Sequence, residues 1–255
     1  MQRHLYLDIE TIPAQRPDVM QEIRDGLQAT LDADIACCKP PGNYKKQETI
    51  DAWMAEEHPK AVQALRDCFE ADVDAAYRKT GLDGAFGQIC VVGFALEDDA
   101  PKTFYVEDWQ NQKDEIAVLQ AFGAYLQETI PPAEHLSTTI IGHNVIGFDL
   151  RYIMQRCIVN KVNPHGIISR AAQAKPWETD RVYDTMLQWG GSGAKPGGSL
   201  DKLCKALSIK SPKGDITGAT VWDAVKAGRI AEVADYCAGD IRATREVHKR
   251  LTFAI

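Results

Sequence analysis

The chain has 255 residues, of which 45% are hydrophobic, so it can bury a sizeable core in one domain. Its formal net charge of −7 is the reverse of what a protein that binds polyanions over its whole surface would show. The seven cysteines include no C-x-x-C pair, and no apolar run approaches the roughly 18 residues of a membrane span. We therefore expect a cytoplasmic protein with reduced thiols, without a disulfide framework, a zinc site or a membrane partner.

The first predicted element is a strand at His4–Ile9, in which the odd-numbered residues are apolar and lie on one face. Asp8 and Glu10 are two residues apart and therefore share the other face. Two carboxylates on one face repel each other unless a cation or a proton lies between them. An edge strand with solvated acids is an equally open interpretation of this short motif.

The middle of the chain alternates between helical and strand patterns. From Pro17 to Gly81 the pattern is mostly helical and is interrupted by KPPGNYKK at Lys39–Lys46. Strands are then predicted at Ile89–Leu96 and Lys102–Val106, and a helix at about 113–129.

A second acidic cluster follows a predicted strand at Thr138–Gly142 and opens a predicted helix at about 147–157. Asp149 falls in the first turn of that helix, where the helix dipole favours a carboxylate. Asn144 lies in the connection and is typical of a turn or a cap. These ordinary roles compete with a role in a functional site, and the cluster alone does not decide between them.

A short strand is predicted around Val182–Asp184, and Asp184 is either an extra acid near the site or a strand-end turn residue. The glycine-rich stretch Gly190–Gly198 lacks the G-K-[ST] ending of a phosphate loop, so we expect a surface loop there. Ser199 is the expected N-cap of a helix at 199–207.

The third cluster lies on a predicted helix at about 231–251. Tyr236 and Asp240 are four residues apart, so a phenol and a carboxylate address the same small volume. The competing interpretation is an amphipathic helix with a half-buried tyrosine and a solvated aspartate. His248, two turns beyond Asp240, is predicted to be a solvated surface residue.

The order of elements is typical of an α/β fold with a mixed sheet flanked by helices. In this order the motifs D-I-E, G-H-N-x-x-x-F-D-L and Y-x-x-x-D resemble those of the DEDD (DnaQ-like) 3′-5′ exonucleases, and in particular the proofreading domain of family B DNA polymerases and small stand-alone polymerase-B-like exonucleases. The resemblance covers Met1 to about Pro13 and about Gly84 to the end. It implies an RNase H-like fold, one exonuclease domain over residues 1–255 and a mainly helical insertion at about 17–83. The chain is too short to contain a polymerase as well, so a stand-alone nuclease is expected.

The resemblance also implies a set of catalytic residues. The carboxylates of Asp8, Glu10, Asp149 and Asp240 would hold two divalent cations, with Asp8 touching both. Oxygen ligands fit Mg²⁺ or Mn²⁺ better than Zn²⁺. The histidine that a second branch places five residues before the last aspartate is absent, so Tyr236 is the expected positioner of the attacking water.

The implied reaction is hydrolysis of phosphodiester bonds at the 3′ end of single-stranded DNA, with release of nucleoside 5′-monophosphates. The residues expected to contact the substrate are Thr11, Asn144 and Phe148. Phe148 or Tyr152 would stack on a terminal base, and a place in the core is the alternative for either ring. RNA is an alternative substrate. A non-catalytic nucleic-acid-binding module is a further alternative, but it requires a lost carboxylate and all four are present. No protein partner is implied.

Two stretches carry excess positive charge despite the acidic total. Lys195–Lys213 holds five lysines and one acid, and Arg151–Arg181 holds six basic residues and two acids. A basic rim around an acidic metal site would reconcile the two signs. Ordinary solvated faces are an equally open interpretation.

Overall fold

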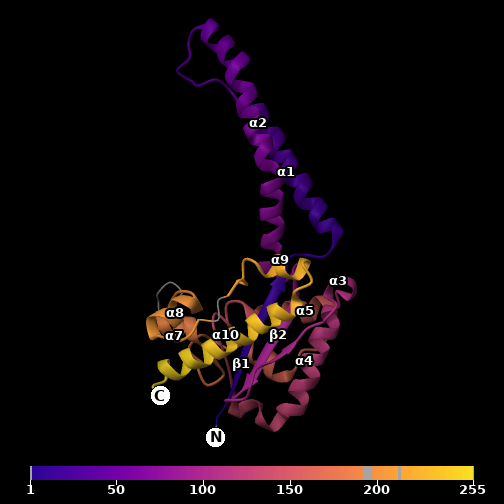
Figure 1. The fold of residues 1–255 in the computed structure, drawn as a ribbon, viewed down its shortest axis with the longest axis vertical. Helices are drawn as coiled ribbons and strands as arrows, with labels where there is room; N and C mark the ends of the chain where they lie inside the picture. Colours follow the sequence, from indigo (N-terminus) through magenta and orange to yellow (C-terminus); the bar gives the residue numbers. More distant parts are fainter. Residues whose placement is uncertain (1, 192–196, 212–213, 255) are drawn as a thin grey trace.

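The computed structural model describes residues 2–191, 197–211 and 214–254. Within these residues one five-stranded sheet runs through the molecule in the order β3-β2-β1-β4-β5 (Figure 1). The strands are β1 (Arg3–Ile12), β2 (Gln88–Leu96), β3 (Lys102–Phe104), β4 (Thr138–Gly142) and β5 (Val182–Asp184). β1 is antiparallel to β2 and parallel to β4, so the sheet is mixed, and the predicted α/β class is confirmed.

β1 is the central strand, and both of its faces are covered. Leu5 and Leu7 belong to the main hydrophobic core, whereas Tyr6 packs on the other face with Ile241. The interpretation of this segment as an edge strand with solvated acids is therefore wrong. Any carboxylate on β1 has to be accommodated in the interior of the protein.

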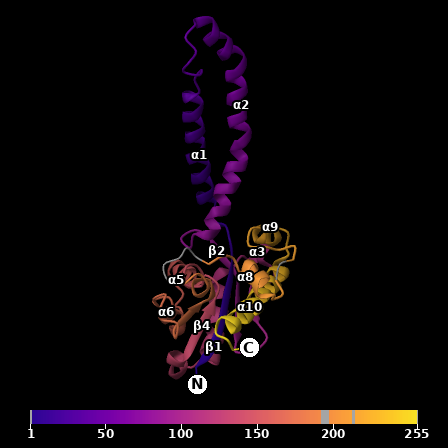
Figure 2. The same cartoon turned by 90° about the vertical axis from the view of Figure 1, so that its left-hand side faces the viewer.

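Helices cover both faces of the sheet (Figure 2). α4 (Glu115–Thr129) and α5 (Asp149–Asn160) pack on the face that carries Leu5 and Leu7, and α10 (Ile230–Leu251) crosses the face that carries Tyr6. The shorter helices are α3 (Trp109–Gln112), α6 (Gly166–Ala171), α7 (Thr185–Gly190), α8 (Leu200–Leu207) and α9 (Val221–Lys226), with 3-10 turns at Thr80–Leu82 and Pro132–Ser137. Because Asp8 and Glu10 alternate with the apolar residues of β1, they face α10.

The predicted strands Thr138–Gly142 and Val182–Asp184 have the observed bounds. α4 begins two residues later than predicted because the Asp114 side chain accepts a hydrogen bond from the Ala117 N–H at 3.0 Å and caps the helix. The predicted N-cap Ser199 is confirmed, since its hydroxyl accepts a hydrogen bond from the Lys202 N–H at 3.4 Å.

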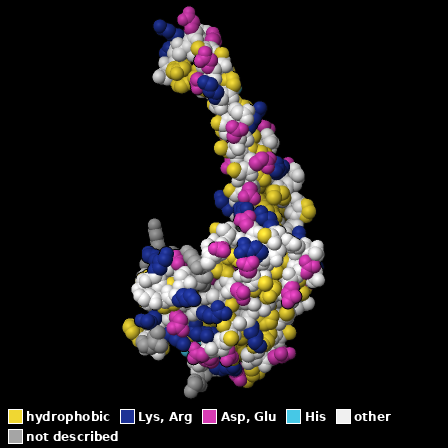
Figure 3. Space-filling model, viewed as in Figure 1, with side chains coloured by type: hydrophobic (Ala, Val, Ile, Leu, Met, Phe, Trp, Pro, Cys, Tyr) yellow, Lys and Arg dark blue, Asp and Glu magenta, His cyan; other side chains and the backbone are white. Residues whose placement is uncertain are grey.

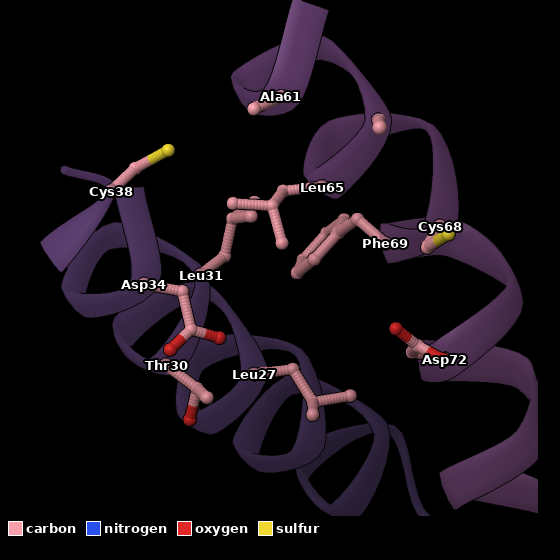
Figure 4. Close-up of a pocket in the computed structure, with 11 residues that line it drawn as sticks. Leu27, Thr30, Leu31, Asp34, Cys38, Ala61, Leu65, Cys68, Phe69 and Asp72 are labelled. Carbon is pink, nitrogen blue, oxygen red and sulfur yellow. The ribbon is translucent and has the colours of Figure 1, made fainter. Parts of the chain in front are cut away.

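α1 (Pro17–Cys37) and α2 (Gln47–Lys79) form a long helical hairpin that projects from the sheet (Figures 1 and 2). Val19 and Val73 are the fully buried residues of these two helices. Leucine side chains and Phe69 meet between the helices beside a cavity of about 580 Å³ (Figure 4). No helix in the described part of the chain has an apolar stretch that could cross a bilayer.

Candidate active site

Asp8 lies on the central strand opposite Gly93 of β2, directly beneath α10. A Cβ atom on Gly93 would lie 2.5 Å from the Cys237 sulfur and 2.6 Å from Cδ1 of Ile241. Only a residue without a side chain lets α10 approach the sheet this closely. Gly93 therefore brings Cys237 and the following turn of α10 down onto the Asp8 carboxylate.

Asp149 joins α5 to β1 through a direct hydrogen bond. Pairing between β1 and β4 ends at Tyr6, so the Ile9 N–H has no partner from β4. The Asp149 carboxylate accepts that N–H at 3.0 Å. As predicted, Asp149 lies in the first turn, although α5 begins at Asp149 rather than at 147, and the dipole of α5 favours its negative charge. The same hydrogen bond holds the buried carboxylate beside the acidic end of β1.

The loop before α5 is shaped by Asp184, the last residue of β5. Its two carboxylate oxygens accept the N–H groups of Asn144 and Ile146, each at 3.0 Å. It also caps α7 by accepting the Met186 N–H at 3.0 Å. Asp184 is thus the strand-end residue that one interpretation expected, and its further role is to position the second acidic motif.

Asn144 lies in this loop with a left-handed backbone, at a φ of 64°. Its carbonyl accepts the Phe148 N–H at 2.9 Å, so its observed role is that of a turn residue. Phe148 is half-buried and tilts against Tyr152, with ring centroids 5.2 Å apart. Thr11 is also half-buried and follows Glu10 at an irregularity in the pairing of β1 with β2.

Tyr236 and Asp240 lie on the first half of α10, and Tyr236 borders a cavity of about 300 Å³. Burial raises the pKa of the Tyr236 phenol well above its ordinary value, and the charges of Asp240 and Glu10 raise it further. A hydrogen bond from the phenol to the Asp240 side chain acts in the same direction. The tyrosine is therefore protonated at neutral pH and acts as a hydrogen-bond donor.

The acids influence one another strongly. Burial raises the pKa of Asp8 well above its usual range, and the charges of Glu10, Asp149 and Asp240 raise it further. Burial also raises the pKa of Glu10, and the charges of Asp240 and Asp149 raise it further. For Asp149, burial is the main cause and the charges of Asp184 and Asp240 add to it, so that its pKa is raised to about 7. The acids of β1, α5 and α10 therefore repel one another, and the hydrogen bond from the Ile9 N–H holds Asp149 beside the volume that Asp8 and Glu10 face.

This volume is suited to a cation. Oδ2 of Asp8 is buried and has no hydrogen-bond partner among the described residues. Burying a charged oxygen without a partner is costly, and a divalent cation would remove that cost for several carboxylates together. The donor set of carboxylate oxygens fits a hard cation such as Mg²⁺ or Mn²⁺.

Cys237 is a neighbour of these acids that the sequence analysis missed. In the described part of the chain, ligand atoms of Asp8, Glu10 and Cys237 lie within 4.8 Å of one another, and Asp149 and Asp240 are not part of this tight group. The Cys237 thiol points to the Asp8 carbonyl at 3.7 Å. Its position three residues before Asp240, on the same helix face, was a usable signal.

One sequence prediction around the site is wrong, and one open alternative is decided. His248 is only 5% exposed, because α10 packs it against the sheet. Its Nδ1 lies 3.0 Å from the Tyr6 hydroxyl, and its ring centroid lies 4.7 Å from that of Tyr183. Tyr152 is 2% exposed and belongs to the core, so it does not stack on a substrate base. Of the two aromatic candidates for stacking, only Phe148 remains.

Fewer basic residues are available for a rim around the acidic site than the sequence indicated. Arg156 is buried and donates to Glu115 at 2.7 Å, so it belongs to the core rather than to a rim. Lys195 and Lys213 lie outside the described residues. Figure 3 shows Lys and Arg side chains over the region of α8 and α10, where they are interspersed with acidic side chains.

The mixed sheet, its acidic central strand and the helix that closes over it define an α/β domain of the kind found in exonucleases. A family model described as a predicted 3′-5′ exonuclease related to the exonuclease domain of PolB matches residues 82–254. The chain belongs to this family, which confirms the resemblance seen in the motifs and makes nucleic acid its class of substrate.

Among solved structures, the chain is similar to the family B DNA polymerase of the hyperthermophilic archaeon Pyrobaculum calidifontis, with a TM-score of 0.51 and 15% identity. The similarity covers 99% of this chain and 25% of the polymerase, so the chain spans about a quarter of that protein's length. At this identity the comparison shows the fold alone. No protein of curated function matches the sequence.

Proposed function

We propose that the chain is a metal-dependent 3′-5′ exonuclease that hydrolyses single-stranded DNA ends and releases nucleoside 5′-monophosphates. The observation that carries this proposal is a cluster of acids at the end of β1. Ligand atoms of Asp8 and Glu10 lie within 4.8 Å of each other, Asp149 is held beside them by the Ile9 N–H, and Oδ2 of Asp8 is buried without a hydrogen-bond partner among the described residues. A protein that only bound nucleic acid would gain nothing from burying mutually repelling acids.

In this proposal, Asp8, Glu10, Asp149 and Asp240 hold two divalent cations. When bound, the ions supply an activated water and stabilise negative charge on the attacking and leaving oxygens of a phosphodiester. Asp149 is oriented by the Ile9 N–H, and Asp184 fixes the loop that leads to it. Such supporting contacts keep the carboxylates in place before substrate arrives.

Tyr236 would orient the attacking water as a hydrogen-bonding group. Its raised pKa makes it a poor base at neutral pH, which agrees with a positioning role. Phe148, half-buried at the start of α5, would contact the terminal base, and Thr11 and Asn144 would contact the substrate strand.

The decisive assay uses single-stranded DNA and RNA of equal sequence, labelled in turn at the 5′ and 3′ ends, with Mn²⁺ or with excess EDTA. We expect the 3′-labelled DNA to release labelled mononucleotide at once, the 5′-labelled DNA to shorten stepwise, and EDTA to abolish both. Faster degradation of RNA would replace the DNA assignment by an exoribonuclease. Robust activity in EDTA, or in the Asp8→Asn variant, would contradict the proposed metal site.

A further inference from the structure

A third cavity, of about 380 Å³, lies where the hairpin joins the sheet. We refer to it as the root pocket, and its lining includes Thr11 and Pro13 after β1, Lys79 and Leu82 at the end of the hairpin, and Ala219 and Trp222 at α9. Thr11 directly follows Glu10, so the pocket begins one residue from the acidic site. Ile216, close in sequence to Ala219, borders the separate cavity that Tyr236 lines.

The wall that the hairpin contributes is fixed to the end of β1. The Tyr77 hydroxyl donates to the Ala14 carbonyl at 2.7 Å, and the Ala14 N–H donates to the Thr80 hydroxyl at 2.9 Å. A Cβ atom on Gly81 would lie 3.2 Å from the backbone of Ile12, so the two segments approach closely. The root of the hairpin is therefore anchored to the strand that carries the catalytic acids.

The opposite wall is held by an ion pair and by ring contacts. The Arg78 guanidinium donates to both carboxylate oxygens of Asp223, at 3.0 and 2.8 Å, and thereby joins the hairpin to α9. The half-buried Trp222 ring packs edge-on against Tyr77, with centroids 6.3 Å apart, and Lys226 lies 5.4 Å from its centre. The indole is thus presented to the pocket in a fixed orientation.

The pocket combines an aromatic ring, an apolar wall, a cation and a hydroxyl. Leu82 is 67% exposed and contributes an apolar side chain to the lining. Lys79 is exposed and has no ion-pair partner among the described residues. A planar base could stack on the aromatic ring and contact the apolar wall, and the phosphate beside it could pair with the lysine.

We propose that the root pocket binds the base of a nucleotide that neighbours the one removed, on a single-stranded DNA substrate. This inference rests on the proposed function and adds to it a subsite to which the inserted hairpin contributes one wall. Trp222 stacks on the base, and Lys79 contacts the adjoining phosphate.

The test measures binding of a fluorescent single-stranded oligonucleotide by the full chain in an Asp8→Asn background, so that no hydrolysis is needed. Because Trp222→Ala removes the stacking contact with one base, it should raise the Kd by about 5- to 150-fold. Trp222→Phe should retain most of the affinity. Trp177→Ala is the matched control and should change nothing, because Trp177 is 76% exposed and borders none of the cavities described here.

An abasic scan then locates the subsite. At one position near the 3′ end, an abasic site should weaken binding to the protein with Trp222 by the factor seen for Trp222→Ala. The same abasic site should not weaken binding to the Trp222→Ala variant any further. If an abasic site at every position weakened binding equally in the proteins with and without Trp222, the assignment would be overturned. Equal competition by free thymidine 5′-monophosphate would also overturn it, because it would indicate a mononucleotide site.

Lys79→Gln keeps the test decisive if Trp222→Ala fails to fold. It should lower the slope of log Kd against log salt by about 0.7, the value for one phosphate contact on a single strand. Lys60→Gln, which removes an exposed lysine higher on the hairpin, should leave the slope unchanged. An unchanged slope in Lys79→Gln would contradict the phosphate contact. Failure of the proposed function would instead appear as absent hydrolysis with Mn²⁺, which this measurement does not involve.

Discussion

The sheet with its covering helices and the projecting hairpin are stabilised in different ways. In the sheet, Glu115 is buried and accepts hydrogen bonds from Arg156 and from the Ile89 N–H, so that α4, α5 and β2 are joined at one point. In the hairpin, exposed glutamines donate to aspartates one turn later at four places, as in Gln21 to Asp25. Contacts of the first kind hold a site rigid, whereas those of the second kind support a helix locally.

The difference extends to the acids. Acids of the hairpin such as Asp72 are exposed to water, whereas Glu10 is buried and Asp8 is half-buried beneath α10. Burying acids together lowers stability, and proteins retain such arrangements mainly at functional sites. We therefore assign the chemistry to the sheet and, in the hairpin, only a contact with the substrate at its root.

The largest expected effect concerns Asp8→Asn. Removing one of the carboxylates that would hold the cations should lower exonuclease activity by at least about 10³-fold. In EDTA at pH 8, the same change should raise the unfolding temperature, because it removes one of several repelling buried charges. Asp72→Asn in the hairpin is the control and should alter neither quantity. If Asp8→Asn lowered the unfolding temperature in EDTA, the claim that the neighbouring carboxylates repel one another would be contradicted.

Tyr236→Phe should reduce activity by about 10²–10⁴-fold or less, because it removes a hydrogen bond to the water and keeps the ring. Binding of Mn²⁺, followed by calorimetry, should be retained. Tyr44→Phe at the tip of the hairpin provides the comparison and should be fully active. If Tyr236→Phe were as inactive as Asp8→Asn with its fold and metal binding intact, the tyrosine would act as an essential base.

Two arginine–glutamate pairs test the comparison through stability. The side chains of Arg156 and Glu115 are 5% and 3% exposed, whereas those of Arg24 and Glu70 in the hairpin are 40% and 70% exposed. Arg156→Met leaves a buried carboxylate without its charged partner and should cost about 3–5 kcal/mol in urea denaturation. Arg24→Met should leave the urea midpoint nearly unchanged. Equal losses would show that the hairpin is as tightly integrated as the core.

The smallest effect is a dependence on pH from His248. Burial, with the charges of His4 and Lys249, lowers the pKa of His248 to about 4, below the roughly 6.5 of an unfolded chain. The unfolded state then binds more protons between these values, so stability is complete above about pH 6.5 and falls as the pH approaches 4. The loss is at most about 3 kcal/mol, and His248→Asn should reduce it.

The matched variant for this prediction is His58→Gln in the hairpin. It should keep the full decrease in unfolding free energy between pH 6.5 and 4. A His248→Asn protein with an unchanged pH dependence would mean that His248 is not the group that titrates.

Motifs and periodicity predicted much of the fold because the signals are local. Alternation of apolar residues located β1, a short run of β-branched residues located β4, and the spacing of Tyr236 and Asp240 placed both on one helix face. Which side chains become buried when a helix packs on the sheet was harder to predict. The position of His248 and Tyr152 in the interior depends on how α10 and α5 pack on the sheet, and nothing in their own segments records that packing.

Contacts with the backbone of distant segments were also missed, although Asp184 itself was expected as a strand-end residue. Asp184 accepts N–H groups from a loop about 40 residues away, and Gly93 matters only because α10 lies above it. Such roles depend on contacts between distant segments, which a single sequence does not display. The root pocket belongs to the same class, since it is formed by three segments that folding brings together.

The measurement that tests the central claim most directly is anomalous scattering from a crystal soaked with Mn²⁺. We predict two manganese peaks among the carboxylates of Asp8, Glu10, Asp149 and Asp240, and the loss of both peaks in Asp8→Asn. Peaks elsewhere on the protein, or an acidic cluster that remains without manganese at saturating concentration, would contradict the assignment of the chemistry to this site.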